Sequence, residues 1–187
     1  MMEEKKVKDA VSGITASEQT KRNTRNVYLF ILSYFTIAII TYYSNMGENE
    51  ILIHFVKYVE SIIPSIHGTA AIASNANYAS LMLVISWCYI LPFYVLLLKS
   101  SNLENFKGNK MKNSGLLMVG STFGVIGFLW AAIYSVPDNT GLSTKLIYNI
   151  IKSFTFGISV WGFIMWLTPS VILYGITVLI VVKKRGY

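Results

Sequence analysis

Side chains that could take part in catalysis or metal binding are few and scattered in this sequence. The two histidines, His54 and His67, lie in one loop, and the single cysteine, Cys88, lies within an apolar stretch. One cysteine can form neither a disulfide within the chain nor a zinc cluster, so we expect Cys88 to fill space in the core. The acidic residues are isolated, and neither a phosphate-binding loop nor a nucleophile paired with a base is present. The sequence therefore predicts a protein that is not an enzyme and that holds no cofactor or metal.

Four long apolar stretches make up most of the chain. They cover about residues 26-43, 78-98, 114-136 and 158-182, and none contains Lys, Arg, Asp, Glu or His. A hydrocarbon core of about 30 Å is crossed by roughly 20 apolar residues of helix. With 53% hydrophobic and 13% charged residues, the chain cannot place these stretches in a water-soluble domain. The sequence predicts an all-α integral membrane protein, a bundle of four transmembrane helices.

The basic residues indicate how this bundle is oriented. Of the 16 Lys and Arg residues, 13 lie before the first span, between spans two and three, or after span four. The remaining three are Lys57, Lys145 and Lys152. Basic loops stay in the cytoplasm, so we expect both termini there, with residues 1-25 as a cytoplasmic arm, 26-182 as the transmembrane domain and 183-187 as a basic tail. The positive charge then reflects topology and anionic lipid, and nucleic acid is not expected as a partner.

Amphipathic helices are expected in both outer loops. Apolar residues recur at helical spacing in the first loop, and Pro64 should end that helix; they are Ile51, Leu52, Phe55, Val59, Ile62 and Ile63. In the second loop Ser143 can cap a helix, which we expect to continue past Phe154 into the fourth span. Both helices should lie at the membrane interface. Tyrosines at the outer ends of spans one and two should anchor that interface; they are Tyr42, Tyr43 and Tyr78.

Small residues and deep aromatic residues mark candidate packing sites inside the bilayer. Gly120 and Gly124 form a GxxxG pair that Gly127 extends, and such glycines let a second helix approach closely. That helix can belong to the same bundle or to a partner protein. Trp87 and Trp166 lie deeper than the usual interfacial belt, and Pro169 should kink the fourth span. The two tryptophans can fill the core or line a groove that binds an apolar group.

Short sequence stretches within this layout resemble a known family. They are Tyr28-Leu29-Phe30-Ile31, Tyr42-Tyr43, Glu60-Ser61-Ile62-Ile63-Pro64-Ser65-Ile66, Leu167-Thr168-Pro169 and Lys183-Lys184-Arg185. Together with four spans and a short cytoplasmic hairpin, they resemble immunity proteins of pore-forming colicins, of the colicin A type. The resemblance implies a multi-pass protein of the bacterial inner (cytoplasmic) membrane that binds a pore-forming toxin and blocks it. The partner site would then include Gly120, Gly124, Gly127, Trp87, Trp166 and Pro169 in the bilayer, and Phe55 and Val59 in the outer loop.

Two other functions fit the same features. The chain can be a non-catalytic subunit or entry-exclusion factor of an inner-membrane secretion or conjugation machine, with its polar arm contacting a cytoplasmic partner. It can also form a small oligomeric pore. In all cases its partners are the lipid bilayer and another protein or another copy of itself.

Overall fold

The described part of the chain consists of helices joined by short connections and contains no strand. The computed structural model describes the backbone of residues 2–100, 120, 122–124, 126–128, 131, 133–137 and 141–184, with side chains for most residues from Lys21 on. The elements are α1 (Met2–Tyr43), η1 (Met46–Glu48), α2 (Glu50–Ile62), α3 (Pro64–Ala70), α4 (Ala76–Ser100), α6 (Leu142–Ser153) and α7 (Gly157–Lys184). Helical residues also occur between 120 and 134, and we call residues 120–137 the third segment.

Among the described residues, three helices are long and apolar enough to cross a membrane. They are Lys21–Tyr43 within α1, Ala76–Ser100 (α4) and Gly157–Val181 within α7, with 23, 25 and 25 residues. At about 1.5 Å per residue, each exceeds the roughly 30 Å of a hydrocarbon core. The predicted spans 26-43, 78-98 and 158-182 are therefore confirmed as membrane-length helices. The predicted span 114-136 lies partly outside the described residues.

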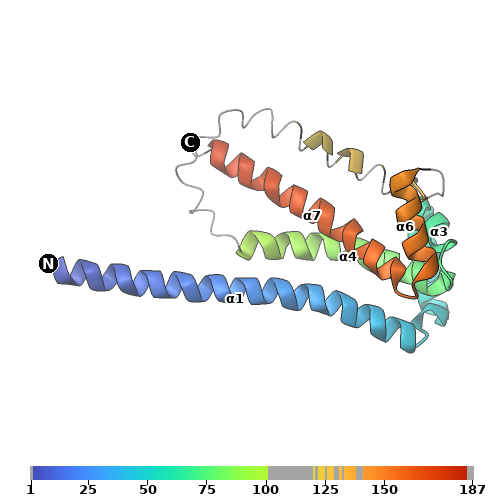
Figure 1. The fold of residues 1–187 in the computed structure, drawn as a ribbon, viewed down its shortest axis with the longest axis horizontal. Helices are drawn as coiled ribbons and strands as arrows, with labels where there is room; N and C mark the ends of the chain where they lie inside the picture. The colour runs from blue at the N-terminus through green and yellow to red at the C-terminus, as the bar shows by residue number, and fades with distance from the viewer. Residues whose placement is uncertain are drawn as a thin grey trace.

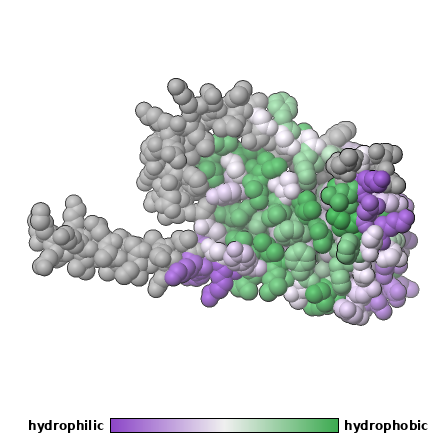
Figure 2. Space-filling model, in the orientation of Figure 1, coloured by the Kyte–Doolittle hydropathy of each residue, from purple (hydrophilic) through white to green (hydrophobic). Residues whose placement is uncertain are grey.

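The surface of these helices is apolar, as a membrane protein requires. Figure 2 shows a broad hydrophobic band over the middle of the molecule, with hydrophilic residues at both ends. Large apolar side chains exposed in this band include Leu29, Leu32, Ile39, Leu91 and Val171. An aqueous surface rarely exposes so much contiguous apolar area, whereas lipid covers it without cost. The chain is an all-helical membrane protein.

Helix α1 is longer than the span it contains. Residues 1-25 were expected to form an arm separate from the first span, but Met2–Tyr43 is one helix of 42 residues. At 1.5 Å per residue it is about 63 Å long. Its N-terminal half projects beyond α4 and α7, while the C-terminal end of α7 lies on the same side of the molecule (Figure 1).

The opposite end carries short helices that we call the cap, comprising η1, α2, α3 and α6 (Figure 1). The Asn49 side chain accepts hydrogen bonds from the Ile51 and Leu52 backbone N–H groups, which begins α2. As predicted, α2 ends before Pro64. Pro64 then occupies the first turn of the next helix, α3. Its fixed φ and missing N–H suit that position.

The chain turns sharply between α6 and α7. A helix continuing past Phe154 was expected, and this prediction is wrong: α6 ends at Ser153, and Phe154 is extended with φ −113° and ψ 130°. A Cβ at Gly157 would overlap the Ile150 carbonyl and approach the Ile151 Cα to 3.0 Å. Only glycine lets the backbone pass so close at this corner. Helix α6 also begins at Leu142, before the predicted cap residue Ser143.

Candidate functional site

A cluster of buried hydroxyl groups joins α1, α4 and α7. The Tyr34 hydroxyl lies 2.9 Å from Ser86 Oγ and donates to the Ser159 carbonyl at 3.0 Å. The Tyr78 hydroxyl lies 2.7 Å from Ser159 Oγ and 3.3 Å from the Ala38 carbonyl. We call Tyr34, Tyr78, Ser86 and Ser159 the hydroxyl seam. All four are buried, so their hydrogen bonds form without competition from water and fix how the three helices pack.

Gly162 lets the helices approach closely enough to form this seam. A Cβ at Gly162 would overlap Ser86 Oγ and lie 2.5 Å from the Tyr34 hydroxyl. Neither Gly162 nor Tyr34 was among the predicted site residues. The sequence offered one signal for this contact, a small residue in one span and serines in a neighbouring span, because membrane helices pack through such residues.

Trp166 lies at the centre of the core. Five aromatic rings surround it at centroid distances of 4.8 to 6.0 Å; they belong to Phe30, Tyr34, Tyr89, Phe93 and Phe163. Its side chain is 0% exposed, and Nε1 has no hydrogen-bond partner among the described residues. Pro169 is buried next to it. The prediction that Trp166 and Pro169 face a partner is therefore wrong, since the protein's own side chains cover both.

Trp87 is placed differently from Trp166. It lines a cavity of about 140 Å³ between the cap and the spans, which we call the apolar cavity. The walls come from α3, α4, the third segment, α6 and α7, and include Ile66, Leu83, Phe128, Ala131, Trp161 and Met165. The walls are mostly apolar, so the cavity suits an aliphatic or aromatic group.

The glycines of the third segment face open space. A Cβ at Gly120, Gly124 or Gly127 would have no atom of the described chain within 4 Å. Phe123 and Ile126, on the same segment, are exposed. Unlike Gly162, these glycines are not used for packing within the described part of the bundle.

Helix α2 divides its apolar residues between two sides. Val59 packs against the core, whereas Phe55 is half exposed. Ile51, Tyr58 and Ile62 are exposed on the same side of the helix as Phe55. The predicted pair Phe55 and Val59 is therefore split, and only Phe55 is on the accessible side.

The burial of two further side chains differs from what the sequence predicted. Tyr78 was expected to be an interface anchor, but it is buried and belongs to the hydroxyl seam. Cys88 was expected to fill the core, but it is exposed on α4. Both errors concern which face of an apolar helix packs inward.

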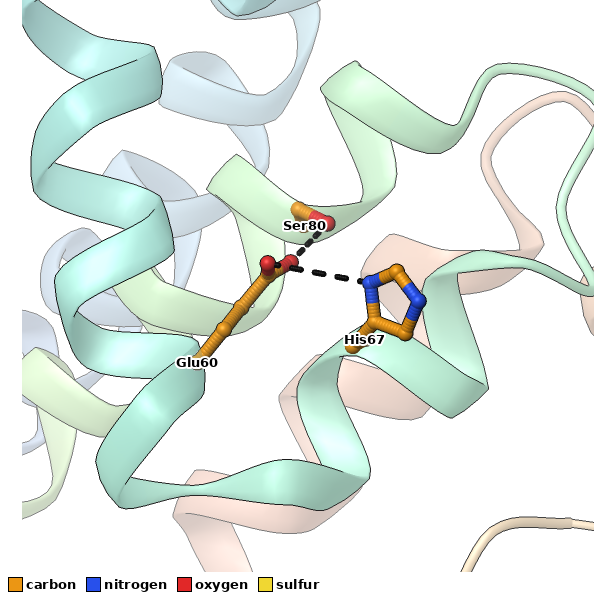
Figure 3. Close-up of polar contacts among 3 residues, drawn as sticks. All are labelled: Glu60, His67 and Ser80. Atoms are coloured by element: carbon orange, nitrogen blue, oxygen red, sulfur yellow. Dashed lines mark hydrogen bonds and ion pairs between the residues drawn. The ribbon is translucent and has the colours of Figure 1, made fainter.

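Two polar side chains of the cap, Glu60 and His67, meet Ser80 of α4 at a pocket between α2, α3 and α4 (Figure 3). Ser80 Oγ donates to Glu60 Oε1 at 2.6 Å, and His67 Nδ1 lies 3.8 Å from Glu60 Oε2. No group of three or more His, Cys, Asp or Glu residues that could hold a metal ion occurs in the part of the chain that the structure describes. No nucleophile is paired with His67 there either, since Ser80 bonds to the carboxylate. The arrangement suits binding of a ligand through Glu60.

Comparison with known proteins found no match among protein-family models, curated proteins or solved structures. The fold alone therefore indicates the class of protein. In its described part, the chain is an all-helical membrane protein with three membrane-length helices and a helical cap.

Proposed function

We propose that this chain is an immunity protein of the bacterial inner membrane, which binds a pore-forming toxin through helix–helix contacts in the bilayer and blocks pore opening. In this proposal the third segment completes a bundle of four transmembrane helices, both termini are cytoplasmic, and the cap lies at the outer leaflet. The placement of 13 of the 16 basic residues supports that orientation.

The open glycine face carries the proposal. Glycines that bring membrane helices together are normally covered by the second helix, as Gly162 is covered by Ser86 and Tyr34. Gly120, Gly124 and Gly127 lack such a covering helix among the described residues. A toxin's apolar hairpin inside the bilayer would supply one.

The apolar cavity is lined by the same segment that carries these glycines. Phe128 and Ala131 of the third segment line it together with Trp87. A helix seated on the glycines could place a large apolar side chain in the cavity. The exposed side of α2, with Phe55, would rest on the outer leaflet beside the same partner.

A protection assay tests the proposal. Cells that express the chain are exposed to a panel of pore-forming colicins, and their membrane potential is followed with a voltage-sensitive dye. We expect protection against one toxin, and we expect Gly124→Leu to reduce it because leucine blocks close helix approach. Gly175→Leu is the matched control, because a Cβ at Gly175 on α7 also meets no described atom within 4 Å.

Two outcomes would contradict the proposal. Sensitivity to every colicin in the panel would remove the toxin as partner. Equal protection by Gly124→Leu and the native chain would remove the glycine face as the contact surface.

A second candidate function is a subunit or entry-exclusion factor of an inner-membrane secretion or conjugation machine. The continuous helix α1 favours it, since residues Met2 to Lys21 extend beyond the span and could bind a cytoplasmic component. Purification from native membranes separates the two functions. A stable stoichiometric complex formed without toxin supports the assembly subunit, and an isolated chain supports immunity.

A further inference from the structure

The pocket at Glu60 has the size and lining of a site for a single side chain. It has a volume of about 210 Å³, and we call it the cap pocket. Its walls come from η1, α2, α3 and the start of α4, and include Gly47, Leu52, Val56, Lys57, Asn77 and Leu81. Pockets for drug-sized molecules usually measure about 300–1,000 Å³, so the cap pocket is too small for most of them.

Glu60 differs from the neighbouring acids in its burial. Its side chain is 16% exposed, whereas Glu48 and Glu50 lie on the exposed surface. Taking a carboxylate out of water costs free energy unless hydrogen bonds or an opposite charge compensate. A carboxylate in this position therefore requires partners.

The described chain supplies only part of that compensation. Ser80 donates to Oε1, but His67 Nδ1 is 3.8 Å from Oε2, beyond hydrogen-bond distance. No Lys or Arg of the described chain lies within 4 Å of the Glu60 carboxylate, although Lys57 lines the same pocket. Because a carboxylate accepts about four hydrogen bonds, Oε2 can still accept donors from a ligand.

We propose that the cap pocket binds a lysine or arginine side chain of the protein partner, an inference that rests on the proposed function and names what the partner presents at the cap. The cationic head pairs with Glu60 Oε2, and its aliphatic stem packs against Leu52, Val56 and Leu81. A metal ion fits less well. Glu60 and His67 offer too few ligands, and the apolar walls of the pocket have no role in holding an ion.

The two histidines make the pocket directly observable by NMR. Protein labelled with ¹³C-histidine and held in neutral detergent at fixed pH gives ring signals from His54 and His67 alone. His67 lines the cap pocket and His54 does not, so His54 is an internal control. The probes are N-acetyl-arginine methyl ester and N-acetyl-citrulline methyl ester, which have similar shapes but differ in charge.

We expect arginine ester at millimolar concentration to shift the His67 signal saturably, with no shift from citrulline ester. Glu60→Gln should abolish the shift, because it removes the charge while its Oε1 can still accept from Ser80. Glu50→Gln, at an exposed acid on the same helix, should leave the shift unchanged. Equal shifts from both esters, a shift that persists in Glu60→Gln, or a response to micromolar Zn²⁺ alone would overturn the assignment.

The protection assay separates this inference from the proposed function. If the native chain protects cells, Glu60→Gln should raise toxin sensitivity about tenfold or more, as loss of a buried charge partner does at interfaces. Full protection by Glu60→Gln would overturn the inference and leave the proposed function standing. Arginine binding without any protection would refute the toxin as partner and leave the chemistry of the pocket intact.

Discussion

The substitution Gly162→Ala tests the packing of the hydroxyl seam directly. The added Cβ would overlap Ser86 Oγ and lie 2.5 Å from the Tyr34 hydroxyl. Both groups are already hydrogen bonded inside the core. Neither can move away without losing a partner, so α7 must shift relative to α1 and α4.

The size of the effect follows from three contributions. Overpacking a filled core costs about 1–3 kcal/mol. Each hydrogen bond between membrane helices contributes about 0.6 kcal/mol, and two are at risk. Alanine's better helix propensity offsets about 0.8 kcal/mol. Gly162→Ala should therefore lower the free energy of unfolding by about 1.4–3.4 kcal/mol.

Unfolding in mixed micelles with increasing SDS, followed by circular dichroism, measures this change. Gly175→Ala is the matched control on the same helix, because its Cβ meets no described atom within 4 Å. We expect it to be neutral or to stabilise by about 0.8 kcal/mol. Ser86→Gly in the Gly162→Ala background should recover part of the lost free energy by removing the overlapping oxygen. Equal unfolding free energies for Gly162→Ala and Gly175→Ala would refute the close approach.

Two further predictions concern the corner and the exposed cysteine. Gly157→Ala should lower the melting temperature, because the added Cβ overlaps the Ile150 carbonyl. Such strain costs about 1–3 kcal/mol of folding free energy. An unchanged melting temperature would contradict the geometry of the corner between α6 and α7. Cys88 should react poorly with a water-soluble maleimide in intact membranes and readily in SDS, because lipid covers this exposed thiol and keeps the reagent away from it. The control is Ser44→Cys in a Cys88→Ser background; residue 44 lies just beyond α1, so this thiol should react in both conditions. Rapid labelling of Cys88 in intact membranes would place α4 outside the bilayer.

Hydropathy and local signals predicted the elements well. Uncharged runs located the three membrane-length helices, because an apolar segment of that length has few other stable environments. Apolar periodicity and Pro64 located α2, because both are local signals and the missing proline N–H acts within a few residues. The corner before α7 was missed, because glycine can continue a helix as well as break one. Contact with Ile150 decides between these outcomes, and the sequence does not display it.

Which side of each span packs inward could not be predicted in the same way. In a soluble helix polar residues mark the outer face, but in a membrane helix both faces are apolar. Core filling and a partner groove therefore both stayed open for Trp166, which the core encloses, and Tyr78 was assigned to the interface although it is buried. The cap pocket depends on Glu60 and Ser80, which are 20 positions apart on different helices. No spacing rule links them, so only the folded arrangement brings them together.

The uninterrupted course of α1 has a mechanical consequence. The helix contacts the cap through η1 at one end, and its other end lies beyond the spans, with no proline or glycine between Asn23 and Tyr43 to act as a hinge. The segment from Asn23 to Tyr43, a stiff rod of about 30 Å, converts a tilt of roughly 5° at one end into a displacement of roughly 3 Å at the other. A contact that tilts α1 at the cap can in this way displace the other end of the helix, on the opposite side of the membrane, without any rearrangement of the core.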